Sequence, residues 1–328
     1  MKRAEVIEYL GNDWIRCGER MNRALGSDID LLNRTNSSIL EHGGKKLRPM
    51  LSLLVARALS QDDGPLSEDS IRYATAVELL HNATLLHDDV ADCSDTRRGR
   101  PTVMSLLGSS AAVLVGDFWL VRAVDEVLSA ESHKLEVIAL FSRTLSDLAE
   151  GEMFQLQKAG SDDTTEGDYL RIIYCKTASL FVTACVSAAK SVNATPQQEE
   201  MVRSYAKALG IAFQIKDDIL DYAGGDLGKP VGQDLREQKI TMPLLGALSS
   251  ADAQTEQKVR SWVRGAAESE ENCSRVMEFV ARRGGLEYAR KRLDEYVAQA
   301  TSALAPLKHS QARDYLVALA EYTASRNK

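Results

Sequence analysis

Apolar residues recur at three- and four-residue intervals along most of the chain, which is the spacing of amphipathic helices. Runs such as VMSLL and AAVLV lack the alternation of a half-buried strand, so they do not predict strands. The pattern therefore predicts an all-α fold. The longest expected helices cover roughly residues 67–93, 109–131, 133–159, 168–190 and 195–222, with several others before and after them.

Local signals agree with these boundaries. Pro49, Pro101 and Pro196 stand where helical segments are expected to begin, a position that tolerates a residue without an N–H group. Thr195, followed three residues later by Gln198, is typical of a capping box. No repeat, low-complexity tract or flexible linker divides the chain, so residues 1–328 are expected to form a single domain. Irregular segments are expected at 61–66, 94–101, 160–167 and 223–239.

Composition narrows the class of protein. The chain has 40 basic and 47 acidic residues, a formal charge of -7, and no long basic run, which argues against nucleic acid as a partner. Its five cysteines are scattered without CxxC spacing, so neither a disulfide framework nor a zinc site is indicated and a cytoplasmic location is expected. No stretch approaches the roughly 18 apolar residues of a membrane span, so none is expected.

Two aspartate clusters carry the first chemical signal. Both have the form DDxxD, and in each the first and last carboxylates are four residues apart, on one helix face. Each cluster ends a long apolar helix, where the helix dipole disfavours negative charge unless a cation compensates it. Hard carboxylate oxygens in this arrangement suit Mg²⁺. The first cluster is Asp88, Asp89 and Asp92, and the second is Asp217, Asp218 and Asp221.

A single DDxxD is also typical of a solvated turn at the end of a helix. Two complete copies, each following an unusually apolar helix, favour the metal interpretation, because a globular fold has no need of such a pair. A facing pair of clusters would hold two or three cations around a diphosphate. We therefore expect magnesium and a diphosphate substrate.

Cationic segments near the first cluster suit a second diphosphate. Lys45, Lys46 and Arg48 follow Gly43-Gly44 at the expected start of a helix, where backbone N–H groups can approach an anion. A turn with a solvated cationic face would have the same sequence. Arg97 and Arg98 directly follow the first cluster and could neutralise phosphate oxygens.

Other polar residues have two interpretations each. His81 precedes Asp88 by seven residues and shares its helix face, but a histidine on an apolar helix is commonly a hydrogen-bonded core residue. Gln214 precedes Asp217 by three residues, so its carbonyl oxygen could contact a developing positive charge, or it could be an ordinary polar helix residue. Further candidate phosphate ligands are Lys176, Thr177, Lys229 and Lys239, of which the last two lie in a glycine-rich segment after the second cluster.

Several segments together resemble the trans-isoprenyl diphosphate synthases, in their long-chain branch, over about residues 43 to 243. These segments are GGKKLRP, LLHNATLLHDDVAD, DTRRGRP, LVGDFWL, CKTASLF, FQIKDDILDY and GKPVGQDL. The resemblance implies an all-helical prenyltransferase fold around a central cavity, usually a homodimer, with Mg²⁺ between the two aspartate motifs. It also implies head-to-tail condensation of isopentenyl diphosphate with an allylic diphosphate primer, giving a long-chain all-trans product.

The resemblance assigns roles to individual residues. It implies that Gly44, Lys45, Arg48, His81 and Arg98 bind isopentenyl diphosphate. It implies that Arg97, Lys176, Thr177, Gln214, Lys229 and Lys239 surround the allylic diphosphate. Asp88, Asp92 and Asp217 would ligate metal, with Asp89, Asp218 and Asp221 as direct or water-mediated helpers, and the catalytic set would be Asp88, Asp92, Asp217, Lys176 and Gln214. One departure is visible, since Gln238 stands where the family commonly has a glycine before the lysine, which puts the backbone near Lys239 in question.

Residues preceding the first cluster bear on product length. Ala83 and Thr84 are small, at positions that resemble the sites of bulky aromatic residues in short-chain relatives, and this predicts a long product. Phe118, Trp119 or Leu120 could still form a floor from a facing helix, or the small residues could merely let two helices pack closely. The alternatives are a farnesyl or geranylgeranyl diphosphate synthase, a terpene cyclase or a non-catalytic synthase subunit. A cyclase needs no second diphosphate pocket, and non-catalytic subunits are expected to lose aspartates.

Overall fold

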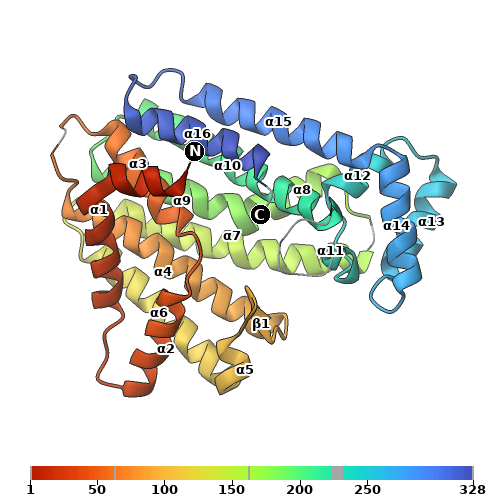
Figure 1. Cartoon of the computed structure of the whole chain (residues 1–328), viewed down its shortest axis with the longest axis horizontal. Helices are drawn as coiled ribbons and strands as arrows, with labels where there is room; N and C mark the ends of the chain where they lie inside the picture. The colour runs from red at the N-terminus through yellow and green to blue at the C-terminus, as the bar shows by residue number, and fades with distance from the viewer. Residues whose placement is uncertain (1, 63, 162, 224–231, 327–328) are drawn as a thin grey trace. The chain divides into compact units, whose positions relative to one another are not determined.

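The computed structural model describes residues 2–62, 64–161, 163–223 and 232–326, which are predominantly helical (Figure 1). The predicted all-α fold is confirmed. The chain divides into two compact units. Unit 1 comprises Met1–Arg143, Val182–Arg203 and Pro306–Leu316, and unit 2 comprises Thr144–Phe181, Ser204–Ala305 and Val317–Lys328. A single domain over residues 1–328 stays a prediction.

Unit 1 contains the N-terminal helices and the first aspartate cluster. Its elements are α1 (Arg3–Ala24), α2 (Asp30–Glu41), α3 (Leu47–Leu59), α4 (Glu68–Ala91), β1 (Thr96–Arg97), β2 (Arg100–Pro101), α5 (Val103–Leu107) and α6 (Ser109–Leu128). Four helices have residues in both units: α7 (Lys134–Ser161), α9 (Ser179–Ser191), α10 (Pro196–Ala223) and α16 (Gln311–Ser325). Unit 2 adds α8 (Glu166–Ile173), the π-helical turn η1 (Tyr174–Ala178), α11 (Gln233–Arg236), α12 (Met242–Leu248), α13 (Ala253–Arg264), α14 (Glu270–Arg282) and α15 (Gly285–Ala303).

The five long helices predicted from periodicity are confirmed as α4, α6, α7, the run α8–η1–α9, and α10. The capping box is also confirmed: the Thr195 N–H donates to Gln198 Oε1 at 2.9 Å, and the Gln198 N–H donates to Thr195 Oγ1 at 3.3 Å. Pro49 and Pro196 lie in the first turns of α3 and α10, as predicted. The helical periods and caps were therefore sufficient to place these elements.

The segment after the first aspartate cluster differs from the prediction. Pro101 lies in β2 of a short antiparallel hairpin rather than at the start of a helix, and α5 begins two residues later. Strands of two residues are too short to show alternation, which is why the sequence gave no signal for them. The segments expected to be irregular at 160–167 and 223–239 also contain helical residues, at the end of α7, the start of α8 and in α11.

Among the residues that the structure describes, one segment is long and apolar enough to cross a membrane, contrary to the expectation that no stretch approaches this length. It covers Glu166–Ser191, and 83% of its apolar window is buried. Burial of this extent is typical of a core helix, because a membrane-spanning helix presents its apolar side chains to lipid.

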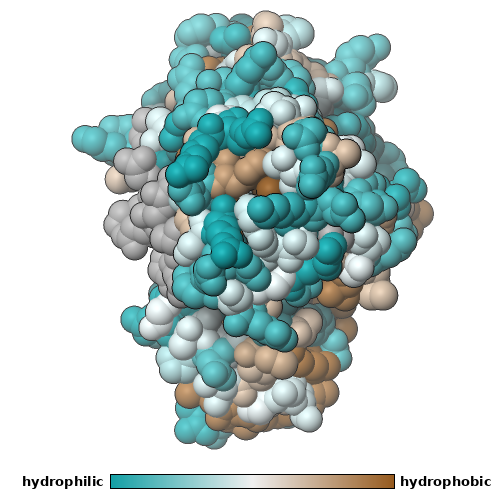
Figure 2. Space-filling model, turned by 90° about the vertical axis from the view of Figure 1, so that its right-hand side faces the viewer, coloured by the Kyte–Doolittle hydropathy of each residue, from teal (hydrophilic) through white to brown (hydrophobic). Residues whose placement is uncertain are grey.

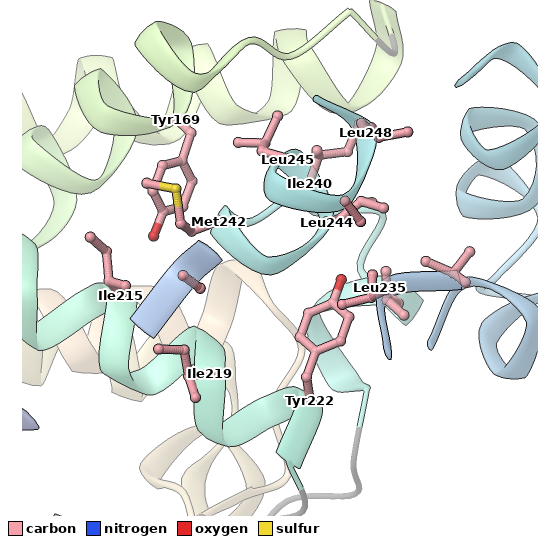
Figure 3. Close-up of a cluster of buried hydrophobic side chains, with 14 of the residues drawn as sticks. Tyr169, Ile215, Ile219, Tyr222, Leu235, Ile240, Met242, Leu244, Leu245 and Leu248 are labelled. Atoms are coloured by element: carbon pink, nitrogen blue, oxygen red, sulfur yellow. The ribbon is translucent and has the colours of Figure 1, made fainter. Parts of the chain in front are cut away.

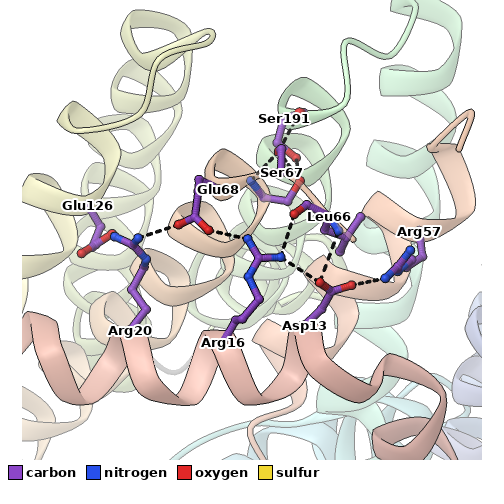
Figure 4. Close-up of polar contacts among 10 residues, drawn as sticks. Asp13, Arg16, Arg20, Arg57, Leu66, Ser67, Glu68, Glu126 and Ser191 are labelled. Atoms are coloured by element: carbon purple, nitrogen blue, oxygen red, sulfur yellow. Dashed lines mark hydrogen bonds and ion pairs between the residues drawn. The ribbon is translucent and has the colours of Figure 1, made fainter. Parts of the chain in front are cut away.

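A polar network, buried at Asp13 and exposed at Glu68, joins α1 to the beginning of α4 in unit 1 (Figure 4). Asp13 is 1% exposed and forms ion pairs with Arg16, at 3.0 Å, and with Arg57. Glu68, in the first turn of α4, pairs with Arg16 and with Arg20, the latter at 2.6 Å. Since a buried carboxylate is costly without its partners, the Asp13–Arg57 pair holds α1 against α3. The Glu68 side chain is exposed, so its pairs add at most about 1 kcal/mol each to the contact between α1 and the start of α4.

An apolar cluster surrounds the end of α10 in unit 2 (Figure 3). Ile215, Ile219 and Tyr222 of α10 are buried, as are Tyr169 of α8 and Leu235 of α11. Full burial of each such side chain contributes on the order of 1.5–3 kcal/mol. The second aspartate cluster is therefore carried by a helix end that is held rigidly within its own unit.

Candidate active site

The first aspartate cluster presents two of its carboxylates to solvent. Asp88 and Asp92 are exposed, whereas Asp89 is 4% exposed. Helix α4 ends at Ala91, and the Asp92 N–H still donates to the Asp88 carbonyl at 2.8 Å. Asp88 and Asp92 thus lie one turn apart on the open side of a helix C-terminus, where a bound cation would offset the unfavourable interaction of their charges with the helix dipole.

Asp89 has a different environment from its two neighbours. Its Oδ1 accepts a hydrogen bond from Arg97 Nε at 2.7 Å. Arg97 pairs with Arg100 across the β1–β2 hairpin, and the two residues between them, Arg98 and Gly99, have φ values of +53° and +73°. Two left-handed residues are typical of a tight two-residue hairpin turn. Asp89 and this turn together fix the position of both candidate arginines.

Four of the residues predicted to bind isopentenyl diphosphate lie together in unit 1: Gly44, Arg48, His81 and Arg98. Burial and the charges of Arg48 and Arg98 hold the pKa of His81 well below its usual value, so His81 is neutral at physiological pH. A Cβ on Gly44 would lie 2.5 Å from the Arg98 guanidinium, so only glycine lets that side chain approach the loop so closely. The fifth, Lys45, is exposed, and its carbonyl accepts from Arg3 Nε at 3.0 Å.

Glu78 also belongs to this cationic group but was not predicted. Its side chain is buried, and burial raises its pKa while the positive charges of Arg48 and Lys46 oppose that rise. A glutamate within the apolar run TAVELLHNA, three residues before His81, was the available signal. When ionised, Glu78 attracts the positively charged side chains of Arg48 and Lys46.

The second aspartate cluster divides in a similar way. Asp217 is partly exposed, and its Oδ1 accepts from Arg326 Nη2 at 2.5 Å. Asp218 is 2% exposed and accepts from the Tyr169 hydroxyl at 2.5 Å; burial and the charge of Asp234 raise its pKa well above the usual value. A metal ion at Asp217 would therefore have to compete with a guanidinium, while Asp218 is committed to internal contacts.

Asp221 supports the segment that follows α10. It is 7% exposed and accepts from the backbone N–H groups of Gln233, at 3.1 Å, and Asp234, at 3.3 Å. These contacts cap α11. The structure thus gives Asp218 and Asp221 contacts within unit 2, and their predicted role as metal helpers stays a prediction.

Thr177 and Gln214 are neighbours in unit 2. The Thr177 hydroxyl donates to Gln214 Oε1 at 2.9 Å, and Gln214 Nε2 donates to Asp218 at 2.9 Å, so both ends of the amide are fixed. Thr177 lies in the π-helical turn η1, a feature common at functional sites. A Cβ on Gly210 would approach Ala178 Cα to 2.6 Å, so glycine is what allows α10 and η1 to pack this closely.

Lys176 has two supporting residues that the sequence did not reveal. Its Nζ pairs with Glu152 and donates to Gln155 Oε1 at 3.1 Å. Both come from GEMFQ in α7, and a Cβ on Gly151 of the same run would lie 2.5 Å from Cys175 Cβ. A glycine followed by Glu-x-x-Gln on one helix face was the signal that could have indicated this contact.

The donor set is compatible with Mg²⁺, which takes one or two carboxylates and completes its shell with water and phosphate oxygens. Within the parts of the chain that the structure describes, no three His, Cys, Asp or Glu side chains are grouped closely enough to hold a metal by themselves. Exposed Asp88 and Asp92 fit a cation that reaches its full coordination only with a diphosphate.

The sequence matches the family described as polyprenyl synthetase over residues 29–280. The chain belongs to this family. An octaprenyl diphosphate synthase from Haemophilus influenzae is 37% identical over 98% of this chain and 97% of its own length. An all-trans-nonaprenyl-diphosphate synthase from Rhodobacter capsulatus is 36% identical over 98% of this chain and 97% of its own.

Solved polyprenyl synthetase structures share the fold over the whole chain. A decaprenyl diphosphate synthase from Rhodobacter capsulatus superposes with a TM-score of 0.90 at 34% identity, covering 100% of both chains. A polyprenyl synthase from Caulobacter crescentus, complexed with calcium and isoprenyl diphosphate, gives a TM-score of 0.89 at 32% identity, covering 100% of this chain and 98% of that one. The isoprenoid-synthase type of helix bundle predicted from the sequence is confirmed.

Gln238 stands where members of the polyprenyl synthetase family commonly have a glycine, and the backbone at this position is left-handed. Gln238 has a φ of +57°, a conformation that favours glycine, and its Nε2 donates to the Arg264 carbonyl at 3.0 Å. The next residue, Lys239, pairs with Glu237, and its N–H donates to the Asp234 carbonyl at 2.8 Å. The structure therefore retains here the conformation that a glycine would favour. Lys229 lies outside the described residues.

Ala83 and Thr84 lie on the part of α4 that precedes the first cluster. Ala83 is 1% exposed, and the partly buried Thr84 donates its hydroxyl to the His81 carbonyl at 2.8 Å. Trp119 of α6, a candidate floor residue, is fully buried and donates its indole N–H to Asn36 at 2.8 Å. A Cβ on Gly116 would lie 2.3 Å from His87 Nε2, so α4 and α6 pack very closely. Both the chain-length role and the packing alternative remain compatible with these contacts.

Proposed function

We propose that this chain is a long-chain trans-polyprenyl diphosphate synthase, a prenyltransferase that adds isopentenyl diphosphate units head to tail to an allylic diphosphate primer. The observation that supports this most directly is the combination of two complete aspartate clusters with the cationic group around His81. Octaprenyl- and nonaprenyl-diphosphate synthases at 36–37% identity over nearly the full length support the long-chain product.

We propose that Asp88, Asp92 and Asp217 ligate Mg²⁺, helped directly or through water by Asp89, Asp218 and Asp221. Magnesium, when bound, draws negative charge from the departing diphosphate and so favours ionisation of the allylic C–O bond. The allylic diphosphate is further neutralised by Arg97, Lys176, Lys229 and Lys239. Glu152 and Gln155 fix the direction of the Lys176 ammonium, which makes its contribution preorganised.

The isopentenyl diphosphate binds to Lys45, Arg48, Arg98, neutral His81 and the backbone at Gly44. A neutral imidazole can donate one hydrogen bond to a phosphate oxygen without adding charge that Arg48 and Arg98 already supply. The dipoles of Gln214 and of the Thr177 carbonyl stabilise the allylic cation, and the isopentenyl double bond attacks it. The departing diphosphate, held by these cations, accepts the proton that leaves the adduct.

We also propose a cytoplasmic homodimer. Exposed apolar residues on α6 support a second copy as the partner: Val113, Leu114, Val121 and Leu128 are 39–68% exposed. Figure 2 shows apolar residues gathered at the lower end of the face it presents. Light scattering should give about twice the chain mass of 36.0 kDa, and a monomer mass at micromolar concentration would exclude the dimer.

The test of the activity is to incubate the purified chain alone with Mg²⁺, labelled isopentenyl diphosphate and farnesyl diphosphate, and to size the products. Long all-trans polyprenyl diphosphates are expected. In a parallel assay with geranyl diphosphate as the primer, products no longer than farnesyl or geranylgeranyl diphosphate would indicate a short-chain synthase. Cyclic hydrocarbons without incorporated label would indicate a cyclase, and the absence of turnover until a second protein is added would indicate a non-catalytic subunit.

A further inference from the structure

A cavity of about 700 Å³ lies in unit 1 between α2, α4, the β1–β2 hairpin and α5. This is within the range of pockets that bind small organic molecules. Some of the side chains that line it belong to the candidate substrate sites, namely Asp89, Arg97 and Arg98, and the mechanism above gives the others no role.

The cavity adjoins the candidate isopentenyl diphosphate site along α4. Asn82, Leu85, Leu86 and Asp89 line it. Leu85 follows His81 by four residues and precedes Asp88 by three, so it shares their helix face, although His81 and Asp88 do not line the cavity themselves. Arg97 and Arg98 of the hairpin also line the cavity and are candidate diphosphate ligands.

Aliphatic side chains form one part of the cavity wall. Leu31 and Ile39 of α2, Leu86 of α4, and Leu106 and Leu107 of α5 all line it. Three of these, Leu31, Leu106 and Leu107, are 42–65% exposed, which leaves unusually large apolar area open to water beside the cavity. An apolar group bound there would remove this area from water, at roughly 25 cal/mol for each Å² buried.

Another part of the wall is cationic. Arg34, Arg98 and Arg100 line the cavity, and their guanidinium groups form no hydrogen bond or ion pair with any residue that the structure describes. The single carboxylate among the lining residues, Asp89, is already paired with Arg97 at 2.7 Å. Three guanidinium groups beside an aliphatic wall complement a molecule with an anionic head and a hydrocarbon tail, and guanidinium is the side chain best suited to phosphate oxygens.

We propose that this cavity is a second binding site for a short prenyl diphosphate, with the diphosphate at Arg34, Arg98 and Arg100 and the prenyl chain against Leu31, Leu86 and Leu106. At about 30 Å³ for each non-hydrogen atom, as in liquid water, the volume accommodates on the order of twenty such atoms. A diphosphate with a ten- or fifteen-carbon chain has this size. The choice of ligand rests on the proposed function, which makes such molecules the primers of the reaction.

Occupancy of this site has a consequence for turnover, because it shares Arg98 with the isopentenyl diphosphate site. A prenyl diphosphate that holds Arg98 in the cavity removes that guanidinium from the other substrate. Excess primer therefore inhibits the enzyme competitively with isopentenyl diphosphate. This inhibition requires no metal at the cavity, since its only carboxylate is used by Arg97.

Binding is tested by calorimetry of the full chain with geranyl diphosphate in EDTA, which suppresses metal-dependent binding at the aspartate clusters. The double variant Arg34→Gln/Arg100→Gln should bind at least tenfold more weakly than the parent. The matched control Arg23→Gln, at an exposed arginine of α1 outside the cavity, should bind like the parent. Inorganic diphosphate should bind the parent at least tenfold more weakly than geranyl diphosphate, because it cannot use the aliphatic wall.

The kinetic test measures initial rates with Mg²⁺ over a wide range of geranyl diphosphate concentration. The parent and Arg23→Gln should lose rate at high primer, and added isopentenyl diphosphate should restore it; the double variant should keep its rate. Equal metal-free affinity in the double variant and the control, equal affinity for inorganic diphosphate, or unchanged inhibition in the double variant would each overturn the proposal. The rate of chain elongation at low geranyl diphosphate concentration tests the proposed function by itself. The proposed function therefore still stands if the second binding site is disproved.

Discussion

At the scale of single residues, the structure separates the aspartates that can meet a metal from those that hold the protein together. Asp88 and Asp92 are exposed and Asp217 is partly exposed, whereas Asp89, Asp218 and Asp221 are buried against Arg97, Tyr169 and the start of α11. The six carboxylates of two identical motifs therefore have unequal roles. The motif alone could not distinguish them, because burial depends on what packs against each helix face.

Replacing Asp88 or Asp217 with Ala should lower turnover by at least two orders of magnitude, on the order of the loss expected when a preorganised stabilising group is removed from a transition state. Rates are measured over a range of Mg²⁺ concentration. Asp314→Ala, at an exposed aspartate of α16, is the control and should keep parental rates. If the alanine variant of either cluster kept most of the parental activity, the assignment of its aspartate as a metal ligand would be wrong.

The Glu152–Lys176 contact leads to a second prediction. Both side chains are about one-third exposed, so the pair contributes at most about 1 kcal/mol, and Glu152→Gln should change kinetics by no more than about fivefold. The change should raise KM for the allylic diphosphate and leave KM for isopentenyl diphosphate unaltered. Glu150→Gln, at an exposed neighbour on α7, serves as the control. A change confined to isopentenyl diphosphate would mean that Lys176 serves the other substrate.

His81 makes stability depend on pH. Its pKa is lowered in the folded protein, so below about pH 6.5 the unfolded chain takes up a proton that the folded chain does not. The free energy of unfolding should therefore fall as pH decreases from 6.5 to 5, by at most about 1.4 kcal/mol per pH unit from this group. Denaturant titrations of the parent and of His81→Gln check this: the variant should show the smaller decrease. Equal slopes would mean that His81 is not buried among these arginines.

At the scale of elements, helices were predictable and their mutual contacts were not. Helix α10 follows from its apolar period, from Pro196 and from the capping box of Thr195, all of which are local signals. The Glu152–Lys176 pair joins residues 24 positions apart, and Glu78 interacts with Arg48 of another helix. A local sequence pattern therefore cannot predict either contact. The β1–β2 hairpin was not predicted because its strands are too short to show the alternation of apolar and polar residues that is typical of a strand.

The turn at Gln238 offers a test at this scale. A left-handed conformation costs a non-glycine residue about 1 kcal/mol, so Gln238→Gly should leave the free energy of unfolding unchanged or raise it by up to about 1 kcal/mol, even though the bond to the Arg264 carbonyl is lost. Gln233→Gly, within the short helix α11, should instead lower it by about 1 kcal/mol. Denaturant unfolding of both variants distinguishes the two positions. Equal destabilisation would show that the left-handed conformation carries no strain.

At the scale of the whole molecule, the family fold was predictable because several motifs occur together in a fixed order over about residues 43 to 243. Product length is a property of the assembled enzyme, since it depends on how much apolar space lies beyond the first aspartate cluster. Helix α4 contributes small residues there, Ala83 and Thr84, and its 24 residues correspond to about 36 Å of helix. An extended isoprene unit covers roughly 5 Å, so a tunnel that ran along this helix would have room for six units or more.

Ala83→Phe should therefore shorten the product distribution while leaving the first condensations nearly unaffected, because an aromatic ring would block the growing chain only after it had passed the metal. Ala83 is 1% exposed, and overpacking there costs about 1–3 kcal/mol, so thermal unfolding must show that the variant still folds. Thr84→Phe provides a second test, since Thr84 is only partly buried and tolerates the larger ring better. Products are sized after incubation with isopentenyl diphosphate and farnesyl diphosphate. If both variants fold and make products of parental length, small residues at 83 and 84 serve the close packing of α4 against its neighbours, and the chain-length role belongs to residues on another helix.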